Sequence, residues 1–133
     1  MDNNACRLFA AQFARRRQIP AVFTMLSRDG MRCQSFLQGP EPADPCLWCA
    51  LPNLDPESAA PCVAAIISSC FLASSFAVFF AHRALMGWPE SVEAFNWREA
   101  DLLGTTPDRV GQIKRRSDRP VCTQDETKSG EPR

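Results

Sequence analysis

Apolar and polar positions in the N-terminal part of the chain follow two periods, which predict one helix and then two strands. Across residues 3–18, apolar side chains recur at the spacing of one helical face, and Pro20 ends that pattern. The apolar run 21–26 favours a buried strand, and residues 31–37 favour a second strand. The Arg-Asp-Gly sequence at 28–30 is a turn signal, because glycine readily adopts positive φ. Helix, strand, turn and strand together predict an α/β fold.

The middle of the chain combines a proline-rich segment with a long uncharged one. Residues 39–61 carry too many prolines for regular structure, so they predict a long loop of a kind that is usually functional or disordered. Residues 59–81 contain no charged side chain, and we expect them to form a buried core helix that ends near Gly87. A single-pass membrane span is the alternative, because about 20 apolar residues suffice to cross a bilayer. The serine and cysteine residues within the run favour the core helix.

The remaining residues predict short elements and then a polar tail. Residues 95–98 favour a short strand, 102–107 a turn and 110–116 a last strand. Residues 123–133 have few apolar positions, so we expect a disordered tail. The length of 133 residues then predicts a single domain over residues 1–122.

Charge and cysteine content narrow the function classes. The 15 basic and 15 acidic residues give a formal net charge of zero, so we expect no nucleic-acid partner. The Arg15-Arg16-Arg17 run is interpreted as a solvated helix end. The seven cysteines are an odd number, and the polar start of the chain shows no secretory pattern. We therefore expect a cytoplasmic protein whose cysteines bind a metal or react, rather than form disulfides.

The sharpest local feature is a Cys-x-x-Cys motif at Cys46 and Cys49. Two thiolates three positions apart on a tight loop can together hold one Zn²⁺ ion, each at a Zn–S distance of about 2.3 Å. A closed site needs two more ligands, and Cys122 is a third candidate, whereas Arg119 stands where its partner cysteine is expected. Loop cysteines without a metal are the alternative. A redox role is disfavoured, because proline and a further loop flank the motif.

Two further residues are candidates for chemistry. Cys62 follows Pro61 at the start of the expected long helix, where the positive end of the helix dipole favours a thiolate nucleophile. A thiol that merely packs is the alternative. Asp2, taken alone, is more typical of a helix cap or a chain terminus than of a catalytic group.

Six short segments occur in an order that is typical of one protein family. They are Asp2-Asn3-Asn4-Ala5-Cys6-Arg7, Ile19-Pro20-Ala21-Val22, Arg28-Asp29-Gly30, Asp44-Pro45-Cys46-Leu47-Trp48-Cys49, Pro61-Cys62 and Asp118-Arg119-Pro120-Val121-Cys122. In order and spacing they resemble the ThiF/MoeB/HesA adenylyltransferases, the bacterial relatives of ubiquitin-activating enzymes. The closest correspondences are to the family patterns D-N-x-x-x-R, x-P-C-x-x-C and the closing D-C-P-V-C.

The resemblance implies the C-terminal part of a Rossmann-like ThiF-type fold, with a helix, two strands, a long crossover loop, a long buried helix and further strands. Such enzymes use ATP to activate the terminal carboxylate of a ubiquitin-like or sulfur-carrier protein, and some then pass the acyl group to a cysteine. The resemblance assigns Mg²⁺-ATP to Asp2 and the acceptor thiol to Cys62. It assigns zinc to Cys46, Cys49 and Cys122, as a clip between the crossover loop and the C-terminal strands.

Three departures limit what the resemblance implies. Val63-Ala64-Ala65 replaces the polar and acidic residues that usually follow the family's cysteine, here Cys62. The sequence contains no G-x-G-x-x-G, so the half of the family's domain that binds the ATP phosphates has no counterpart. Arg119 also replaces one zinc cysteine. We therefore expect a truncated or split fragment that is inactive alone, and that works with the missing N-terminal half or as a homodimer. A zinc-stabilised interaction module without catalysis is the alternative.

Overall fold

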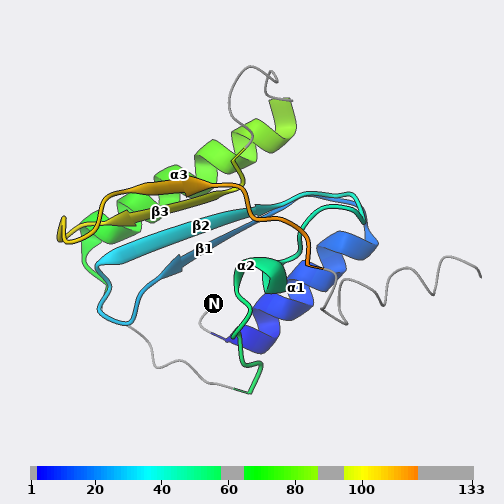
Figure 1. The fold of residues 1–133 in the computed structure, drawn as a ribbon, viewed down its shortest axis with the longest axis horizontal. Coiled ribbons are helices and arrows are strands. Elements are labelled where there is room, and N and C mark those ends of the chain that lie inside the picture. Colours follow the sequence, from blue (N-terminus) through cyan, green and yellow to red (C-terminus); the bar gives the residue numbers. More distant parts are fainter. Residues whose placement is uncertain (1–2, 58–64, 87–94, 117–133) are drawn as a thin grey trace, which may run out of the picture.

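A computed structural model of the chain describes residues 3–57, 65–86 and 95–116. The elements in chain order are α1 (Asn4–Arg16), β1 (Ala21–Leu26), β2 (Arg32–Gln38), α2 (Leu47–Ala50), α3 (Ile67–Met86), β3 (Trp97–Asp101) and β4 (Arg109–Gly111) (Figure 1). Helices and strands are thus mixed, which confirms the expected α/β class.

The four strands form one sheet in the order β1-β2-β3-β4. Strands β1 and β2 form the predicted hairpin, whose turn contains Gly30 at φ +71°. Helix α3 connects β2 to β3, and these two strands pair directly. All three pairings are antiparallel, so the strands described here do not by themselves form a Rossmann-like parallel sheet.

The helices cover the two faces of the sheet, because successive side chains of a strand point to opposite faces. On one face, Phe23 and Phe36 pack with residues of α1 and α2. On the other face, Cys33 packs with Phe76 of α3 and with Ala100. The core therefore has two layers, one on each side of the sheet, and Figure 1 shows α3 on the side away from α1 and α2.

The expected long helix is present as α3, but the expectation that it is buried is wrong for one of its faces. Ser69, Phe76 and Phe80 are buried, whereas the opposite face is open to solvent. The sheet covers one side of a helix only, and no other described element covers the second. Helix α3 ends at Met86, as expected. By length and composition alone it could cross a membrane, a test that the core helix of a soluble protein also passes.

Helix α3 begins at Ile67, after the non-helical residues 65 and 66, so the expectation that it starts at Cys62 is wrong. Three other elements differ from their expected bounds. A one-turn helix, α2, lies in the segment that was expected to be a loop, and β3 extends to Asp101. Strand β4 is shorter than expected because the amide of Asn96 replaces a strand partner. Its Oδ1 accepts from the N–H of Ile113 at 2.7 Å, and its Nδ2 donates to the C=O of that residue at 3.0 Å. The expected tail at 123–133 lies outside the described residues.

Candidate metal centre

Cys46 and Cys49 lie together at α2. Cys46 is the residue before the helix, Cys49 is in its single turn, and both are buried, with 8% and 6% of their surface exposed. Their Sγ atoms are 3.7 Å apart. Two Zn–S bonds of about 2.3 Å at a tetrahedral angle place the sulfur atoms about 3.8 Å apart. The dithiol therefore already has the spacing that one zinc ion requires.

Gln38, the last residue of β2, holds the first turn of α2 in place. Its side chain is fully buried. The Nε2 atom donates to the C=O of Ala11 at 2.9 Å, and the Oε1 atom accepts from the N–H of Leu47 at 3.1 Å. One amide thus joins α1, β2 and α2, and it satisfies the N–H of Leu47, which would otherwise be buried without a partner at the start of α2.

Arg15 holds the loop that leads to Cys46. Its guanidinium donates to the carbonyl oxygens of Glu41 and Asp44, the latter at 2.9 Å. Arg15 is buried, so the interpretation of the whole arginine run as a solvated helix end is wrong at this position. A signal was available in the sequence, because Arg15 continues the buried stripe of Leu8 and Ala11 at helical spacing.

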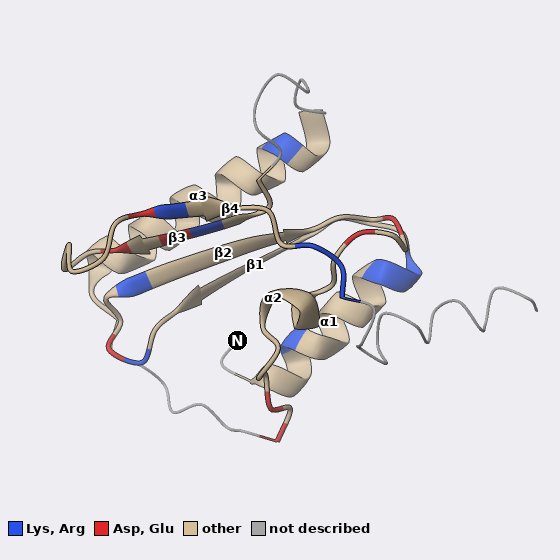
Figure 2. Ribbon diagram, in the orientation of Figure 1, with Lys and Arg blue, Asp and Glu red and all other residues tan. Residues whose placement is uncertain are grey.

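The C-terminal segment returns to the cysteine pair after β4. Ile113 packs against Cys46 and Cys49, and the backbone N–H of Arg116 donates to Cys49 Sγ at 3.4 Å. Residues 114–116 are all basic and run beside α2 (Figure 2). The C-terminal segment therefore brings a backbone donor and a basic run to the cysteine pair.

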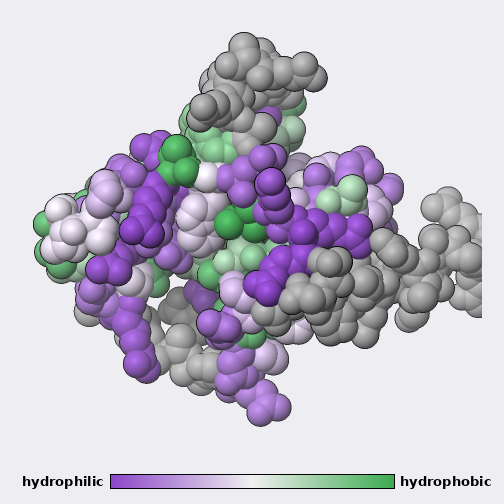
Figure 3. Space-filling view, in the orientation of Figure 1, coloured by the Kyte–Doolittle hydropathy of each residue, from purple (hydrophilic) through white to green (hydrophobic). Residues whose placement is uncertain are grey.

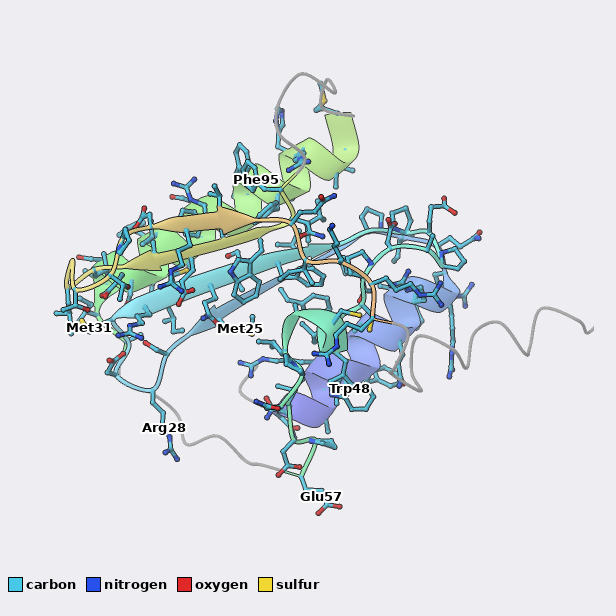
Figure 4. The ribbon with its side chains drawn as sticks, viewed as in Figure 1. Met25, Arg28, Met31, Trp48, Glu57 and Phe95 are labelled. Carbon is cyan, nitrogen blue, oxygen red and sulfur yellow. The ribbon has the colours of Figure 1, made fainter. Side chains whose placement is uncertain are left out.

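Trp48 lies between the two cysteines in the sequence and contacts both the loop after α2 and the core cluster formed with α1. Its indole Nε1 donates to the C=O of Leu54 at 3.2 Å, and its ring packs against the core cluster formed with α1. Figure 4 shows this side chain projecting from α2 toward α1. The cysteine pair therefore lies between α1, the loop after α2 and the returning C-terminal segment.

The start of α1 is tied to the same loop. Asn3 caps the helix by accepting from the N–H of Ala5 at 2.8 Å. Asn4 Nδ2 donates to the C=O of Asp55 at 2.9 Å, and Asn4 Oδ1 accepts from the guanidinium of Arg7 at 3.0 Å. The segment that resembles D-N-x-x-x-R thus joins the loop that follows the Cys-x-x-Cys motif.

The other predicted site residues are not brought to this pair by the part of the chain that the structure describes. Asp2, Cys62 and Cys122 lie outside the described residues, as does Arg119. Within residues 3–57, 65–86 and 95–116, no group of three or more His, Cys, Asp or Glu side chains is placed to hold a metal ion. Two of the three predicted zinc ligands are therefore together.

The sequence matches no known protein family model, and no curated protein matches it either. The functional proposal therefore rests on the geometry around Cys46 and Cys49.

Proposed function

We propose that residues 1–122 form the C-terminal half of a ThiF-type adenylation domain, which activates the terminal carboxylate of a ubiquitin-like or sulfur-carrier protein with ATP. The supporting observation is the contact between Cys49 and Arg116. These residues are 67 positions apart, and their 3.4 Å hydrogen bond brings the segment before Asp118–Cys122 to the Cys-x-x-Cys motif. Arg116, two residues before the Asp118–Cys122 segment, thus lies beside the Cys-x-x-Cys motif.

On this proposal, zinc is held by Cys46, Cys49 and Cys122. The first two have the required spacing. Cys122 follows Arg116 by six residues, a stretch that can span up to about 20 Å. Arg119 stands where the fourth ligand is expected, so the chain supplies three thiolates. Bound zinc would join the C-terminal segment to α2, and its binding free energy would add to folding.

The unpaired outer edge of β1 is the second observation that supports the proposal. Strand β1 is at the end of the sheet and pairs with β2 alone among the described strands. Backbone groups on its outer edge can accept a further strand. A phosphate-binding half would add its own strand there. Because the sequence lacks the glycine-rich phosphate loop, another segment has to supply it.

The chemistry assigned to the complete domain has two steps. The substrate carboxylate attacks the α-phosphorus of ATP, pyrophosphate leaves, and an acyl-adenylate forms. A Cys62 thiolate then attacks the acyl carbon, and AMP leaves with the electron pair of the broken C–O bond. Asp2 is the residue that would hold Mg²⁺ with ATP, because a hard carboxylate oxygen suits this cation. The 133-residue chain without the phosphate loop is proposed to be inactive by itself.

The test is ATP–pyrophosphate exchange with and without a complementary half. The DNA upstream of the start codon is first searched for an in-frame glycine-rich loop, and the protein that it encodes is produced with this chain. Exchange is expected only when both parts and a carrier protein with a free C-terminal carboxylate are present. Micromolar ATP binding by the isolated chain, measured by calorimetry, would contradict the assignment of a half domain.

The role of Cys62 is tested in the reconstituted enzyme. Cys62→Ser should keep exchange and lose the thioester, and unchanged transfer of the acyl group would remove Cys62 from the mechanism. Cys6→Ser, at an exposed position on α1, is the matched control.

A zinc-stabilised interaction module is the second candidate, favoured by a well-formed cysteine pair in a sequence without a phosphate loop. One equivalent of zinc together with no exchange in the reconstituted pair would support the module and exclude the enzyme.

A further inference from the structure

The two cysteines of the pair lie at the ends of one helical turn. The N–H of Cys49 donates to the C=O of Cys46 at 2.9 Å, which closes the turn. Residues three positions apart in such a turn have Cα atoms about 5 Å apart, from the radius and rise of a helix. That separation lies within the range of about 4.4–6.8 Å that a disulfide requires. The backbone at α2 therefore already accommodates a disulfide between Cys46 and Cys49.

The two sulfur atoms have only a short way to move before they can bond. They are 3.7 Å apart, with one thiol donating to the other. A disulfide has an S–S distance of about 2.05 Å, so the sulfur atoms have to approach by about 1.7 Å, which rotation about the side-chain bonds can supply. The expectation against a redox role assumed a motif within a loop, whereas the structure places Cys49 in the turn of α2.

The other cysteines that the structure describes lie on different elements. Cys6 on α1 and Cys70 on α3 are exposed, and Cys33 is buried with Phe76 on the other face of the sheet. The two cysteines of the pair are only 8% and 6% exposed, so a bulky disulfide reagent has little access to either sulfur. Hydrogen peroxide is small enough to be the oxidant for such a pair. Disulfides that form in cytosolic proteins are usually transient and sense the redox state.

We propose that Cys46 and Cys49 form a reversible disulfide, which acts as a redox switch on the C-terminal segment. One thiolate attacks a peroxide oxygen, the O–O bond breaks, and a sulfenic acid forms as hydroxide leaves. The second thiolate attacks the sulfenic sulfur, and a second hydroxide leaves as the S–S bond forms. The two thiol protons convert both hydroxides to water. Two thiols and one hydrogen peroxide thus give one disulfide and two waters, and two electrons pass from sulfur to oxygen.

The switch acts through the contact between Cys49 and Arg116. The N–H of Arg116 donates to Cys49 Sγ at 3.4 Å, and Ile113 packs against both cysteines. A disulfide sulfur carries no negative charge and has to move toward Cys46, so it accepts this hydrogen bond less well. Residues 114–116 are basic, and Figure 3 shows strongly hydrophilic surface where this segment passes α2. Such side chains gain little from burial, so oxidation loosens the segment.

The neighbouring residue Ile113 should stay in place on oxidation. Its N–H donates to Asn96 Oδ1 at 2.7 Å, and its C=O accepts from Asn96 Nδ2 at 3.0 Å. Neither of these bonds involves a cysteine, so the effect is confined to the residues that follow Ile113. A disulfide also removes both thiolates that a metal needs, so zinc and the disulfide exclude each other. The inference does not depend on the proposed function, because it concerns the metal-free pair.

The first test titrates the reduced, metal-free full chain with hydrogen peroxide and identifies the linkage. Alkylation in denaturant and proteolysis then isolate residues 33–57, which contain Cys33, Cys46 and Cys49. This fragment should carry an alkyl group on each cysteine before oxidation and on Cys33 alone afterwards, and dithiothreitol should restore the other two. Cys70→Ser is the matched control and should form the same linkage. A linkage from either cysteine of the pair to any other cysteine would overturn the proposal.

The second test measures hydrogen exchange at single amides by NMR. The amide of Arg116 should exchange about fivefold faster in the oxidised chain, the factor that corresponds to the loss of a hydrogen bond worth about 1 kcal/mol. The amide of Ile113 should keep its rate, and peroxide should change neither rate in Cys49→Ser. An unchanged rate at Arg116 despite a complete linkage would overturn the switch. Equal acceleration at Ile113, or a pair that stays reduced while Cys6 and Cys70 are oxidised, would overturn it as well.

Discussion

The Oε1 atom of Gln38 accepts a hydrogen bond from the backbone N–H of Leu47, 3.1 Å away, and so couples the last residue of β2 to the turn that carries the cysteine pair. Gln38→Leu should leave this N–H buried without a partner and remove the second hydrogen bond that the C=O of Ala11 accepts. The expected loss of unfolding free energy is about 1–3 kcal/mol, measured by urea unfolding. Gln12→Leu, on the exposed side of α1, is the control and should change it little. An unchanged midpoint for Gln38→Leu would contradict the assigned role.

Zinc should protect Cys46 and Cys49 from alkylation. We expect about one equivalent of zinc per chain by elemental analysis, and slow modification of both thiols until a chelator is added. Peptide mapping by mass spectrometry identifies the modified cysteines. The Cys46→Ser, Cys49→Ser double variant should bind no zinc at this site, whereas Cys70→Ser, on exposed α3 surface, should bind it normally. Equal modification rates with and without chelator would count against a metal at the pair.

Cys33 should stay unreactive in the folded protein at neutral pH. Its side chain is fully buried, and burial raises the pKa of its thiol to about 11, although a hydrogen bond with Ser35 acts in the opposite direction. Iodoacetamide should therefore modify exposed Cys6 and Cys70 first, and Cys33 only after unfolding. Modification of Cys33 at the rate of Cys70 would mean that β2 is open to solvent.

Asp101 should make the folded protein sensitive to acid. The hydroxyl of Thr105 donates to its carboxylate at 2.5 Å, the N–H of Leu103 donates at 3.0 Å, and Thr106 donates twice at 3.1 Å. Burial acts against these bonds, but they lower the pKa of Asp101 from 3.8 to about 2. Because the folded value is the lower one, this contribution to stability is present above pH 3.8 and is lost as the pH falls toward about 2.

Asp101→Asn should therefore be less stable than the wild type near neutral pH, and the difference should shrink as the pH falls through this window. Urea unfolding at a series of pH values measures it. Glu57→Gln, at an exposed position, is the control, and its difference in stability from the wild type should not change in this way with pH. A difference between Asp101→Asn and wild type that is constant with pH would assign the effect to packing rather than to charge.

Much of the fold could be predicted from local pattern. Helix α1, the hairpin of β1 and β2 with its Gly30 turn, and α3 each have a clear periodicity or turn signal, so their types follow from neighbouring residues. Helix α2 could not be predicted, because a single turn has no periodicity and depends on the buried amide of Gln38. The end of β4 depends on Asn96, whose partner is 17 positions away.

Some residues of the candidate site could likewise be predicted from local sequence, and others could not. The spacing of Cys46 and Cys49 identifies the pair from sequence, since two cysteines three positions apart share one turn. Arg15 and Arg116 could not be assigned to it, because each reaches the region from a distant element. The burial of Arg15 has a local signal in the helical spacing, but its partner, a backbone carbonyl 29 positions away, has none.

By itself, the sequence determined that residues within 59–81 form a helix and that two cysteines meet at one turn, because both properties depend on neighbours within a few positions. Only the tertiary structure decided which face of α3 is buried and which segment returns to Cys49. A nearly all-apolar helix has no polar face to orient it, so the sheet selects Phe76 and Phe80 for burial and leaves Phe71 and Val78 in solvent.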